Sequence, residues 1–311
     1  MKVASLIALV VTPIIAATGV VADPQQQAKR PGFYKNSKHI YNLTPQNFDD
    51  VVLQTNHTSV VEFYAPWCGY CAEFESQYRK AAKIGSEFVN FAAVNCDEDK
   101  NKPLCNKYRV EGFPTVMVFR PAKVNSAGSN GNRPHSSETY RGERTAAKLL
   151  EHVKGRVVNY VKRIKLNKLD EFLKPNEKSR VLLVTSKSTL SPVFKSLSID
   201  FLDSVTLAYL TLSENDSEGR DKLLEKIPAL KADFKVPTLL AIDKGTKNVT
   251  VYDSESMSKK ELTKFMSKFG QPQEGAMSER GGILKGIKKG AYKSFKDYKK
   301  KMQQALEKDE L

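Results

Sequence analysis

Cysteine and histidine are scarce in this chain. Its 311 residues include four cysteines, four histidines and one tryptophan. All the cysteines fall between residues 68 and 105, whereas the disulfide framework of a stapled secreted scaffold would spread them along the chain. The histidines, at His39, His57, His135 and His152, are scattered. We assign them no catalytic role, and we expect no metal site.

Long apolar runs are missing after the N-terminus. Residues 3–15 are nearly all apolar, follow a lysine and precede small residues at Val20 to Ala22, which indicates a secretory signal peptide over residues 1–22. No later stretch approaches the ~18 apolar residues of a membrane span. Residues 308–311 read Lys-Asp-Glu-Leu, the retrieval signal of the endoplasmic reticulum (ER). We therefore expect an ER-lumen protein without a membrane span, which the KDEL receptor retrieves.

Acidic residues are outnumbered, with 35 Asp and Glu against 50 Lys and Arg, a formal net charge of +15. The basic residues are densest between Arg280 and Lys301, where the one acidic residue is Asp297. This balance favours acidic partners, and in the ER lumen we expect no nucleic acid. Residues 271–311 form a basic tail with helical apolar spacing, but its glycines weaken the first half of that helix. The tail is either a spacer that presents the retrieval signal or an amphipathic segment that touches membrane.

Four Asn-x-Ser/Thr sequons are compatible with the secretory route. The candidate glycosylation sites are Asn42, Asn56, Asn215 and Asn248.

Apolar runs and helical patterns alternate along the chain twice, which predicts two α/β domains, residues 36–155 and 156–270. Residues 23–35 resemble a loose leader, and residues 121–139 a polar loop. In the first domain we expect strands over 39–43, 59–64, 88–94 and 116–120 and helices over 46–52, 68–84, 102–108 and 144–153. In the second we expect strands over 181–184, 205–212, 236–241 and 247–252 and helices over 191–201, 221–226 and 259–269.

The most informative feature is a strand that passes directly into Cys-x-x-Cys. Val60 to Tyr64 is an apolar, β-preferring run, Pro66 makes the turn, and Cys68 and Cys71 open a helix. A helix N-terminus favours a thiolate, the reactive form of cysteine, and a second thiol three residues on can close a disulfide. The pattern predicts a dithiol redox centre. In the second domain Thr189–Val193 occupies the corresponding place without thiols.

Two other interpretations of the cysteines exist. A zinc site would need Cys96 and Cys105 to join Cys68 and Cys71, but their spacing is not that of paired zinc knuckles. A purely structural bridge between Cys68 and Cys71 would close almost no loop and so add little stability. Redox chemistry is the better interpretation.

Three segments carry a resemblance to a known family: Glu62–Cys71, Gly112–Thr115 and Tyr140–Thr145. In this order and spacing they resemble the active domain of protein disulfide isomerases. The resemblance is specific over residues 59–153 and rests on pattern over 156–270. It implies an α/β fold of two thioredoxin-like domains in tandem, the first active (a-type) and the second thiol-less (b-type), followed by the basic tail.

The resemblance also implies roles for four residues. Cys68 would be the exposed attacking thiol and Cys71 the buried thiol that resolves a mixed disulfide. Glu62, buried on the strand beneath, would relay the Cys71 proton. Arg144 would approach the second cysteine and favour its thiolate. Without the resemblance, Glu62 would be a solvent-facing strand residue and Arg144 a solvated residue in the first turn of a helix.

The remaining candidate residues would bind substrate. Pro114 would be a cis-proline facing the dithiol rather than an ordinary turn proline, and the Phe113 backbone would pair with an extended client. Trp67, Gly69 and Tyr70 complete this set, Trp67 with a packing role as well. Many isomerases carry histidine where this chain has Tyr70. A phenol brings no positive charge to the Cys68 thiolate, so we expect a less oxidising couple.

Cys96 ends a predicted strand and Cys105 falls in the next predicted helix. We expect a second disulfide between them, which would stabilise the domain or tune the nearby site; the alternative is two buried free thiols.

The sequence thus predicts a thiol–disulfide oxidoreductase or isomerase acting on unfolded or misoxidised secretory proteins. It would need no cofactor because electrons move between sulfurs. Further candidate partners are an ER oxidase and an acidic lectin chaperone. The competing hypothesis is a redox-inert chaperone or adaptor, and replacing Cys68 and Cys71 with serine would discriminate between the two.

Overall fold

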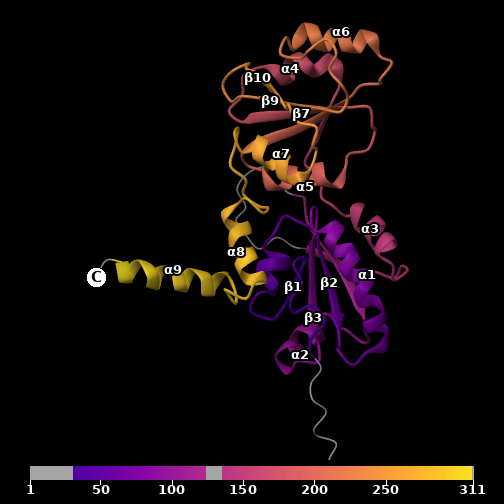
Figure 1. Cartoon of the computed structure of the whole chain (residues 1–311), viewed down its shortest axis with the longest axis vertical. Helices are drawn as coiled ribbons and strands as arrows, with labels where there is room; N and C mark the ends of the chain where they lie inside the picture. Colours follow the sequence, from indigo (N-terminus) through magenta and orange to yellow (C-terminus); the bar gives the residue numbers. More distant parts are fainter. Residues whose placement is uncertain (1–30, 124–134, 310–311) are drawn as a thin grey trace, which may run out of the picture. The chain divides into compact units, whose positions relative to one another are not determined.

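The computed structural model describes residues 31–123 and 135–309, with side chains to residue 305 (Figure 1). The predicted signal peptide, most of the expected leader and the end of the retrieval signal lie outside the described residues. Within the described part of the chain, no helix is both long enough and apolar enough to cross a membrane.

The first domain is built on a five-stranded sheet with the order β1-β3-β2-β4-β5. Its strands are β1 (Ile40–Asn42), β2 (Ser59–Tyr64), β3 (Asn90–Asn95), β4 (Thr115–Pro121) and β5 (His135–Thr139). β1, β3 and β2 run parallel, and β4 and β5 join antiparallel. Every residue of the central strand β2 is buried, as expected for a strand covered on both faces.

Helices cover both faces of this sheet. They are α1 (Gly69–Gly85), α2 (Lys102–Lys107) and α3 (Ala146–Lys154), with a π-helix η1 (Asp49–Leu53) and a 3₁₀ turn η2 (Asp99–Asn101). Along β2, Val60 and Tyr64 pack in the cluster formed with α1 and α3, whereas Val61 and Phe63 pack with η1 and α2. Successive strand side chains point to opposite faces, so Glu62 lies on the α1 face.

The second domain repeats this plan with the strand order β10-β9-β7-β8-β6. Its strands are β6 (Lys162–Ile164), β7 (Ser179–Thr185), β8 (Val205–Thr211), β9 (Thr238–Ile242) and β10 (Val249–Val251). Its helical segments are η3 (Leu166–Lys168), α4 (Leu169–Leu173), α5 (Pro192–Asp200), α6 (Ser217–Lys226) and α7 (Lys259–Met266). Apolar clusters lie on both faces of this sheet as well.

Two helices follow, α8 (Glu279–Lys288) and α9 (Phe295–Asp309). α8 lies beside β1 of the first domain (Figure 1). Its side chains Leu284 and Ile287 are buried in the cluster of η1 and α2. The weak first half that the glycines predicted is therefore helical. Ser278 caps it by accepting a hydrogen bond from the Gly281 N–H at 2.9 Å, and burial of its apolar face offsets the low propensity.

Two carboxylates join segments that are distant in the sequence. Glu274 accepts hydrogen bonds from the Thr55 hydroxyl (2.6 Å) and from the Asn56 backbone N–H (2.9 Å). Asp200, at the end of α5, pairs with His57 Nε2 (2.7 Å) and Lys259 Nζ (2.9 Å). Each carboxylate is almost fully buried, and each compensates its lost hydration with these bonds.

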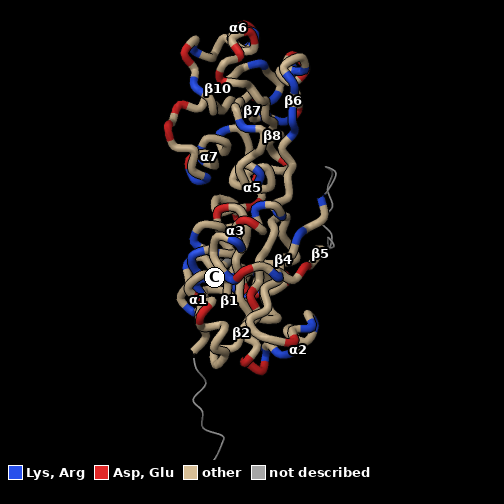
Figure 2. Tube along the Cα trace, turned by 90° about the vertical axis from the view of Figure 1, so that its right-hand side faces the viewer, with Lys and Arg blue, Asp and Glu red and all other residues tan. Residues whose placement is uncertain are grey.

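The basic residues are not confined to the tail. In Figure 2, Lys and Arg positions are spread over both domains among Asp and Glu positions.

Several expected elements of the first domain differ from the observed ones. β5 lies inside the stretch expected to be a polar loop. The sequence did not predict this strand because four of its five side chains are exposed, so they show no apolar alternation. The helix expected over 46–52 is the later π-helix η1, preceded by a turn in which the Thr44 N–H binds the Asn47 side chain. Thr145 caps α3, so Arg144 lies before that helix and not in its first turn.

The second domain also differs in detail from the expected elements. β6 and α4 were not expected, since they are short and at most partly apolar. Ser191 is the N-cap of α5 and accepts a hydrogen bond from the Phe194 N–H (3.1 Å). Ser191 therefore corresponds to Cys68 and Phe194 to Cys71, one residue later than the sequence alignment of Thr189–Val193 placed them.

Candidate active site

Cys68 lies at the junction of β2 and α1. Its backbone is extended (φ −77°, ψ 118°), and it forms the N-cap of α1. The Cys71 N–H donates a hydrogen bond to Cys68 Sγ at 3.2 Å. A sulfur at this position receives an unpaired helix N–H and the positive end of the helix dipole, both of which favour the thiolate.

Both thiols are free, and both are covered. Cys71 is fully buried, and Cys68 is 8% exposed. The expectation of an exposed Cys68 is therefore wrong, because only a small part of this residue is accessible. The loop before β4 covers it, with Cys68 Sγ 3.6 Å from the Phe113 carbonyl oxygen.

The loop that faces Cys68 contains a cis peptide bond between Phe113 and Pro114. Pro114 precedes the first residue of β4, so the sheet fixes the position of the loop. The second domain has a cis bond at the same place in its sheet, between Val236 and Pro237 before β9.

Glu62 is completely buried beneath the dithiol. Tyr34 donates a hydrogen bond from its hydroxyl to Glu62 Oε2 at 2.6 Å, and Glu62 Oε1 has no hydrogen-bond partner among the described residues. Burial raises the pKa of Glu62 to about 8, although the Tyr34 hydrogen bond acts in the opposite direction. A carboxyl with this pKa exchanges its proton near neutral pH.

The Cys71 thiol is difficult to ionise. Burial, followed by the hydrogen bond with Cys68, raises the pKa of Cys71 above its ordinary range, and the negative charge of Glu62 adds to this effect. A thiol in this environment needs a base close by in order to attack a disulfide. Glu62 interacts electrostatically with it and lies on the same face of the sheet.

Arg144 is exposed and reaches toward the same loop. Its Nη2 donates to the Pro114 carbonyl oxygen at 3.5 Å, and its charge lowers the pKa of Glu62. Arg144 therefore lies close enough to act on the carboxyl electrostatically.

The outer rim of the site is aromatic. Trp67 is 60% exposed and Tyr70 is 67% exposed. Trp67 packs edge-on against Phe113, with ring centroids 5.8 Å apart, and donates from Nε1 to Asp97 at 3.0 Å. Its packing is thus limited to one edge. A side chain at Gly69 would meet no atom within 4 Å, so this residue leaves open space beside the thiol.

Cys96 and Cys105 form a disulfide with Cα atoms 6.1 Å apart. Both are buried in the cluster with η1 and α2, on the sheet face opposite to α1. The disulfide therefore supports the domain from that face, whereas Cys68 and Cys71 pack in the cluster with α1 and α3. In the described part of the chain, no group of three or more His, Cys, Asp or Glu residues is placed to hold a metal ion.

The four sequons differ in their surroundings. Asn42, Asn215 and Asn248 are exposed. Asn56 is half-buried, and its Nδ2 donates to Glu274 Oε1 at 2.6 Å.

Tyr34 is the site residue that sequence reasoning missed. The polar, proline-containing stretch around it predicted a loose leader, yet its side chain is fully buried and forms aromatic contacts with Tyr64 and Tyr78. The signal that could have found it is the aromatic pair Phe33-Tyr34 in an otherwise polar segment.

Comparison with known proteins agrees with this geometry. The thioredoxin family model matches residues 39–154. Protein disulfide-isomerase MPD1 of Saccharomyces cerevisiae is 35% identical over 283 residues, which cover 85% of this chain and 89% of the yeast protein. The chain belongs to the protein disulfide isomerase family. Like other members of that family, it is a thiol–disulfide exchange enzyme.

Several other isomerase relatives match a shorter stretch of this chain. Human protein disulfide-isomerase A6 is 40% identical over 120 residues, 39% of this chain and 24% of that protein. A crystal structure of ERdj5 aligns with 76% of this chain and 30% of its own at a TM-score of 0.55 and 19% identity. This last likeness concerns the fold alone. The two sheets with their helices are two thioredoxin-like domains in tandem.

Proposed function

We propose that this isomerase-family enzyme forms and rearranges disulfides in secretory proteins of the ER lumen through the Cys68–Cys71 couple. The observation that carries the proposal is the Cys71 N–H···Sγ bond to Cys68 at the N-terminus of α1, opposite the cis-Pro114 loop. The lumenal location rests on the sequence, namely the signal peptide and the Lys-Asp-Glu-Leu ending.

The reaction begins at Cys68. Its thiolate attacks one sulfur of a client disulfide; that S–S bond breaks, a Cys68–client bond forms, and the second client sulfur leaves as a thiolate that takes up a proton. The free N–H groups of α1 stabilise the attacking thiolate. The Phe113 backbone beside Cys68 pairs with the extended client, and Trp67 and Tyr70 contact its side chains.

Two outcomes follow from the mixed disulfide. In isomerisation, a client thiolate attacks the mixed disulfide and releases Cys68 unchanged, with no net electron transfer. In reduction, Cys71 gives its proton to the Glu62 carboxylate and attacks Cys68 Sγ. The client then leaves with two electrons, and the enzyme keeps a Cys68–Cys71 disulfide. Oxidation of a client is the reverse sequence, and it requires an oxidant such as an ER oxidase to restore the disulfide.

Electrons pass only between sulfurs in this scheme, so the exchange needs no metal or organic cofactor. Arg144 biases Glu62 toward the ionised state through its positive charge. The partners are unfolded or misoxidised secretory proteins, with an acidic lectin chaperone as a further candidate for the basic surface and the KDEL receptor for retrieval.

The second domain contributes binding in this proposal. Ser191 and Phe194 replace the two cysteines there, so the domain has no exchange chemistry of its own. A redox-inert chaperone function is the competing candidate. The test is replacement of Cys68 and Cys71 with serine: loss of the in-cell function supports exchange, and full retention favours the chaperone.

The biochemical test measures the redox equilibrium of the Cys68–Cys71 couple against glutathione, together with the refolding of a scrambled disulfide-bonded protein. Equilibration near the ER poise, about −180 to −210 mV, with rescue of the scrambled protein would support an isomerase. An inert or strongly reducing couple without rescue would contradict it.

A further inference from the structure

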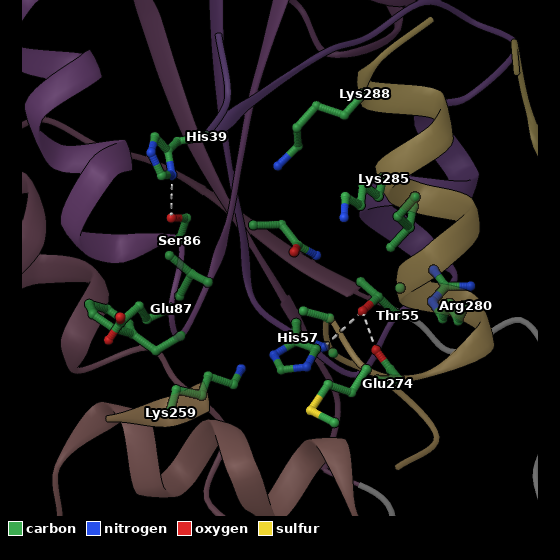
Figure 3. A pocket seen from close by; sticks show the side chains of 18 of the residues that line it. His39, Thr55, His57, Ser86, Glu87, Lys259, Glu274, Arg280, Lys285 and Lys288 are labelled. Atoms are coloured by element: carbon green, nitrogen blue, oxygen red, sulfur yellow. Dashed lines mark hydrogen bonds between the residues drawn. The ribbon is translucent and has the colours of Figure 1, made fainter. Parts of the chain in front are cut away.

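A cavity of about 490 Å³ lies where the first domain, α7 and α8 meet (Figure 3). We name it the α8 pocket. Six lysines and arginines line it: Lys38, Lys259, Lys260, Arg280, Lys285 and Lys288. Two glutamates also line it, Glu87 and Glu274. The lining is therefore strongly cationic.

Some of these charged groups already have hydrogen-bond or ion-pair partners within the protein. Lys259 pairs with Asp200 and donates to the Ser196 hydroxyl. Glu274 is occupied by Thr55 and Asn56. Arg280 donates to the Asp50 carbonyl oxygen.

Other charges have no counter-ion. Among the described residues, no carboxylate lies within ion-pair distance of Lys285, Lys288 or Lys38. Lys288 is half-buried, and its Nζ lies 3.8 Å from the centroid of the Tyr41 ring. Burial lowers the pKa of Lys288 to about 8, so it still carries its charge at neutral pH. A partly desolvated ammonium without a carboxylate is an unusual feature unless an anion completes it.

The two lysines of α8 that lack a carboxylate partner in the described part of the chain lie on the same face of the helix. Lys285 and Lys288 are three positions apart, which places them on one face of the helix. In Figure 3 both side chains extend from α8 toward the cavity, while His39 and Ser86 lie on the opposite wall. Glu87 lies on that far side too, away from both lysines. The anion-attracting part of the α8 pocket is thus next to α8.

His39 is affected by the positive charges around the cavity. Its Nδ1 is bonded to the Ser86 hydroxyl at 3.0 Å. After burial, the charges of Lys288, Lys83 and Lys38 are the causes that lower the pKa of His39. An anion bound beside Lys288 would oppose these charges.

We propose that the α8 pocket binds the phosphate group of a small molecule, with Lys285 and Lys288 as its principal ligands. A tetrahedral phosphate offers several oxygens in different directions, and charge-assisted N–H···O bonds to it are strong. The volume exceeds that of one phosphate, and Phe88, Val89 and Leu284 give the cavity an apolar wall for an organic group. The ligand source is either an organic phosphate or a free inorganic phosphate.

This site is separate from the dithiol. Cys68 caps the first turn of α1, whereas Ser86 to Asn90 follow the last turn. α1 has 17 residues, so its two ends are about 25 Å apart at 1.5 Å per residue. Phosphate binding at the α8 pocket therefore neither depends on the proposed disulfide chemistry nor touches its residues.

The first experiment is calorimetric titration of the full chain, in phosphate-free buffer, with pyrophosphate, adenosine diphosphate and uncharged adenosine. We expect one site per chain for the two phosphates and no binding of adenosine. Tighter binding of adenosine diphosphate assigns the site to organic phosphates, and equal binding assigns it to free inorganic ones.

The matched variants are K285Q/K288Q in the pocket and K299Q/K300Q on exposed positions of α9, which remove the same charge. We expect the pocket variant to weaken phosphate binding by roughly tenfold or more per ammonium and the α9 variant to leave it almost unchanged. Thiol–disulfide exchange should be unaltered in both. Absence of phosphate binding, or equal loss in the two variants, would overturn the proposal, as would binding of an acidic peptide in place of both phosphates.

A second measurement works on the unmodified protein. NMR titration of the His39 ring should show a higher pKa with pyrophosphate bound than without it. If His39 titrates identically in both conditions, the α8 pocket is not the binding site.

Discussion

Tyr34 holds the buried carboxyl of Glu62 from a segment outside the sheet, with 2.6 Å between the Tyr34 hydroxyl oxygen and Glu62 Oε2. The tyrosine is itself anchored: Arg79 lies over its ring, 5.1 Å from the centroid, and donates to the Phe33 carbonyl oxygen. The protonation of the carboxyl beneath the dithiol therefore depends on a residue that precedes β1 as well as on burial.

Replacing Tyr34 with phenylalanine should raise the pKa of Glu62 above about 8, because the hydrogen bond that lowers it is lost. A hydrogen bond to a charged group is worth about 1.5–3 kcal/mol, which corresponds to a rise of roughly 1–2 pKa units. The rate at which Cys71 resolves a mixed disulfide should then need a higher pH by the same amount. The measurement is the pH profile of single-turnover resolution.

The control for Tyr34→Phe is Tyr78→Phe. The Tyr78 hydroxyl is equally buried but donates to backbone carbonyl oxygens of Val60 and Ala92. The Tyr78→Phe substitution should lower stability but should shift the pH profile of resolution much less than Tyr34→Phe does. A Tyr34→Phe profile that coincides with that of the unmodified enzyme would contradict the role of Tyr34.

Replacing Glu62 with glutamine should stabilise the fold in a pH-dependent way. The folded-state pKa, about 8, lies above the ordinary value of 4.5, so the folded protein binds this proton more tightly and loses stability as pH rises between the two values. The difference in the free energy of unfolding between the Glu62→Gln variant and the unmodified protein should be small at pH 4 and grow to a few kcal/mol by about pH 9. Thermal unfolding at both pH values measures it, and a gain that does not grow with pH would refute the assigned burial cost. Resolution by Cys71 should slow in the same variant.

Replacing Tyr70 with histidine should make the couple more oxidising. An imidazolium beside Cys68 stabilises its thiolate and hence the dithiol form. Stabilisation by about 1.4 kcal/mol would raise the reduction potential by about 30 mV. Equilibration with glutathione measures the potential, with Tyr70→Phe as the control for loss of the hydroxyl alone. A histidine variant with the potential of the phenylalanine variant would rule out this explanation.

Replacing Cys96 and Cys105 with alanine should destabilise the protein by about 2–3 kcal/mol, the loop-closure contribution for a separation of 9 residues. Because this disulfide lies on the sheet face opposite to α1, the potential of Cys68–Cys71 should stay the same. Urea unfolding with intact Cys68 and Cys71 tests stability, and the glutathione equilibrium tests the potential. A potential that shifts with the double substitution would show coupling across the sheet.

Asn56 should be glycosylated far less than Asn215 and Asn248 in folded protein from a secretory host. Its Nδ2, to which a glycan would attach, is half-buried against the carboxylate of Glu274, whereas the other two side chains are exposed. Glycopeptide mass spectrometry measures the occupancy of each site. Full occupancy of Asn56 would mean that the Glu274 contact does not form in that material.

The dithiol could be predicted from the sequence because its signal is local: an apolar strand, a proline turn and two cysteines at helical spacing. The cis-Pro114 loop could be expected only through resemblance to a family, since nothing in its composition specifies a cis bond. The aromatic pair Phe33-Tyr34 could have indicated that Tyr34 is buried, but its role could not be predicted, because that role depends on a contact with Glu62, 28 residues away in the chain. The cover over Cys68 comes from Phe113, which is likewise distant in sequence.

The α8 helix illustrates the same point for the fold. Its glycines lower its intrinsic propensity, and the sequence therefore predicted a doubtful helix. The helix forms because Leu284 and Ile287 fill a gap on the first sheet, a long-range contact that propensity does not contain. The strand β5 was missed for the opposite reason, since its hydrogen bonds to β4 need no apolar pattern.

The contact of Arg280 with Asp50 spans 230 positions of the chain. A ribosome adds about 5–20 residues per second, so roughly 7 to 30 s separate synthesis of β5 from that of Ile287. During that interval the sheet and its dithiol are present, but the apolar face that α8 covers is open to solvent. The first domain is thus made first but is completed only after α8 has been synthesised, late in translation.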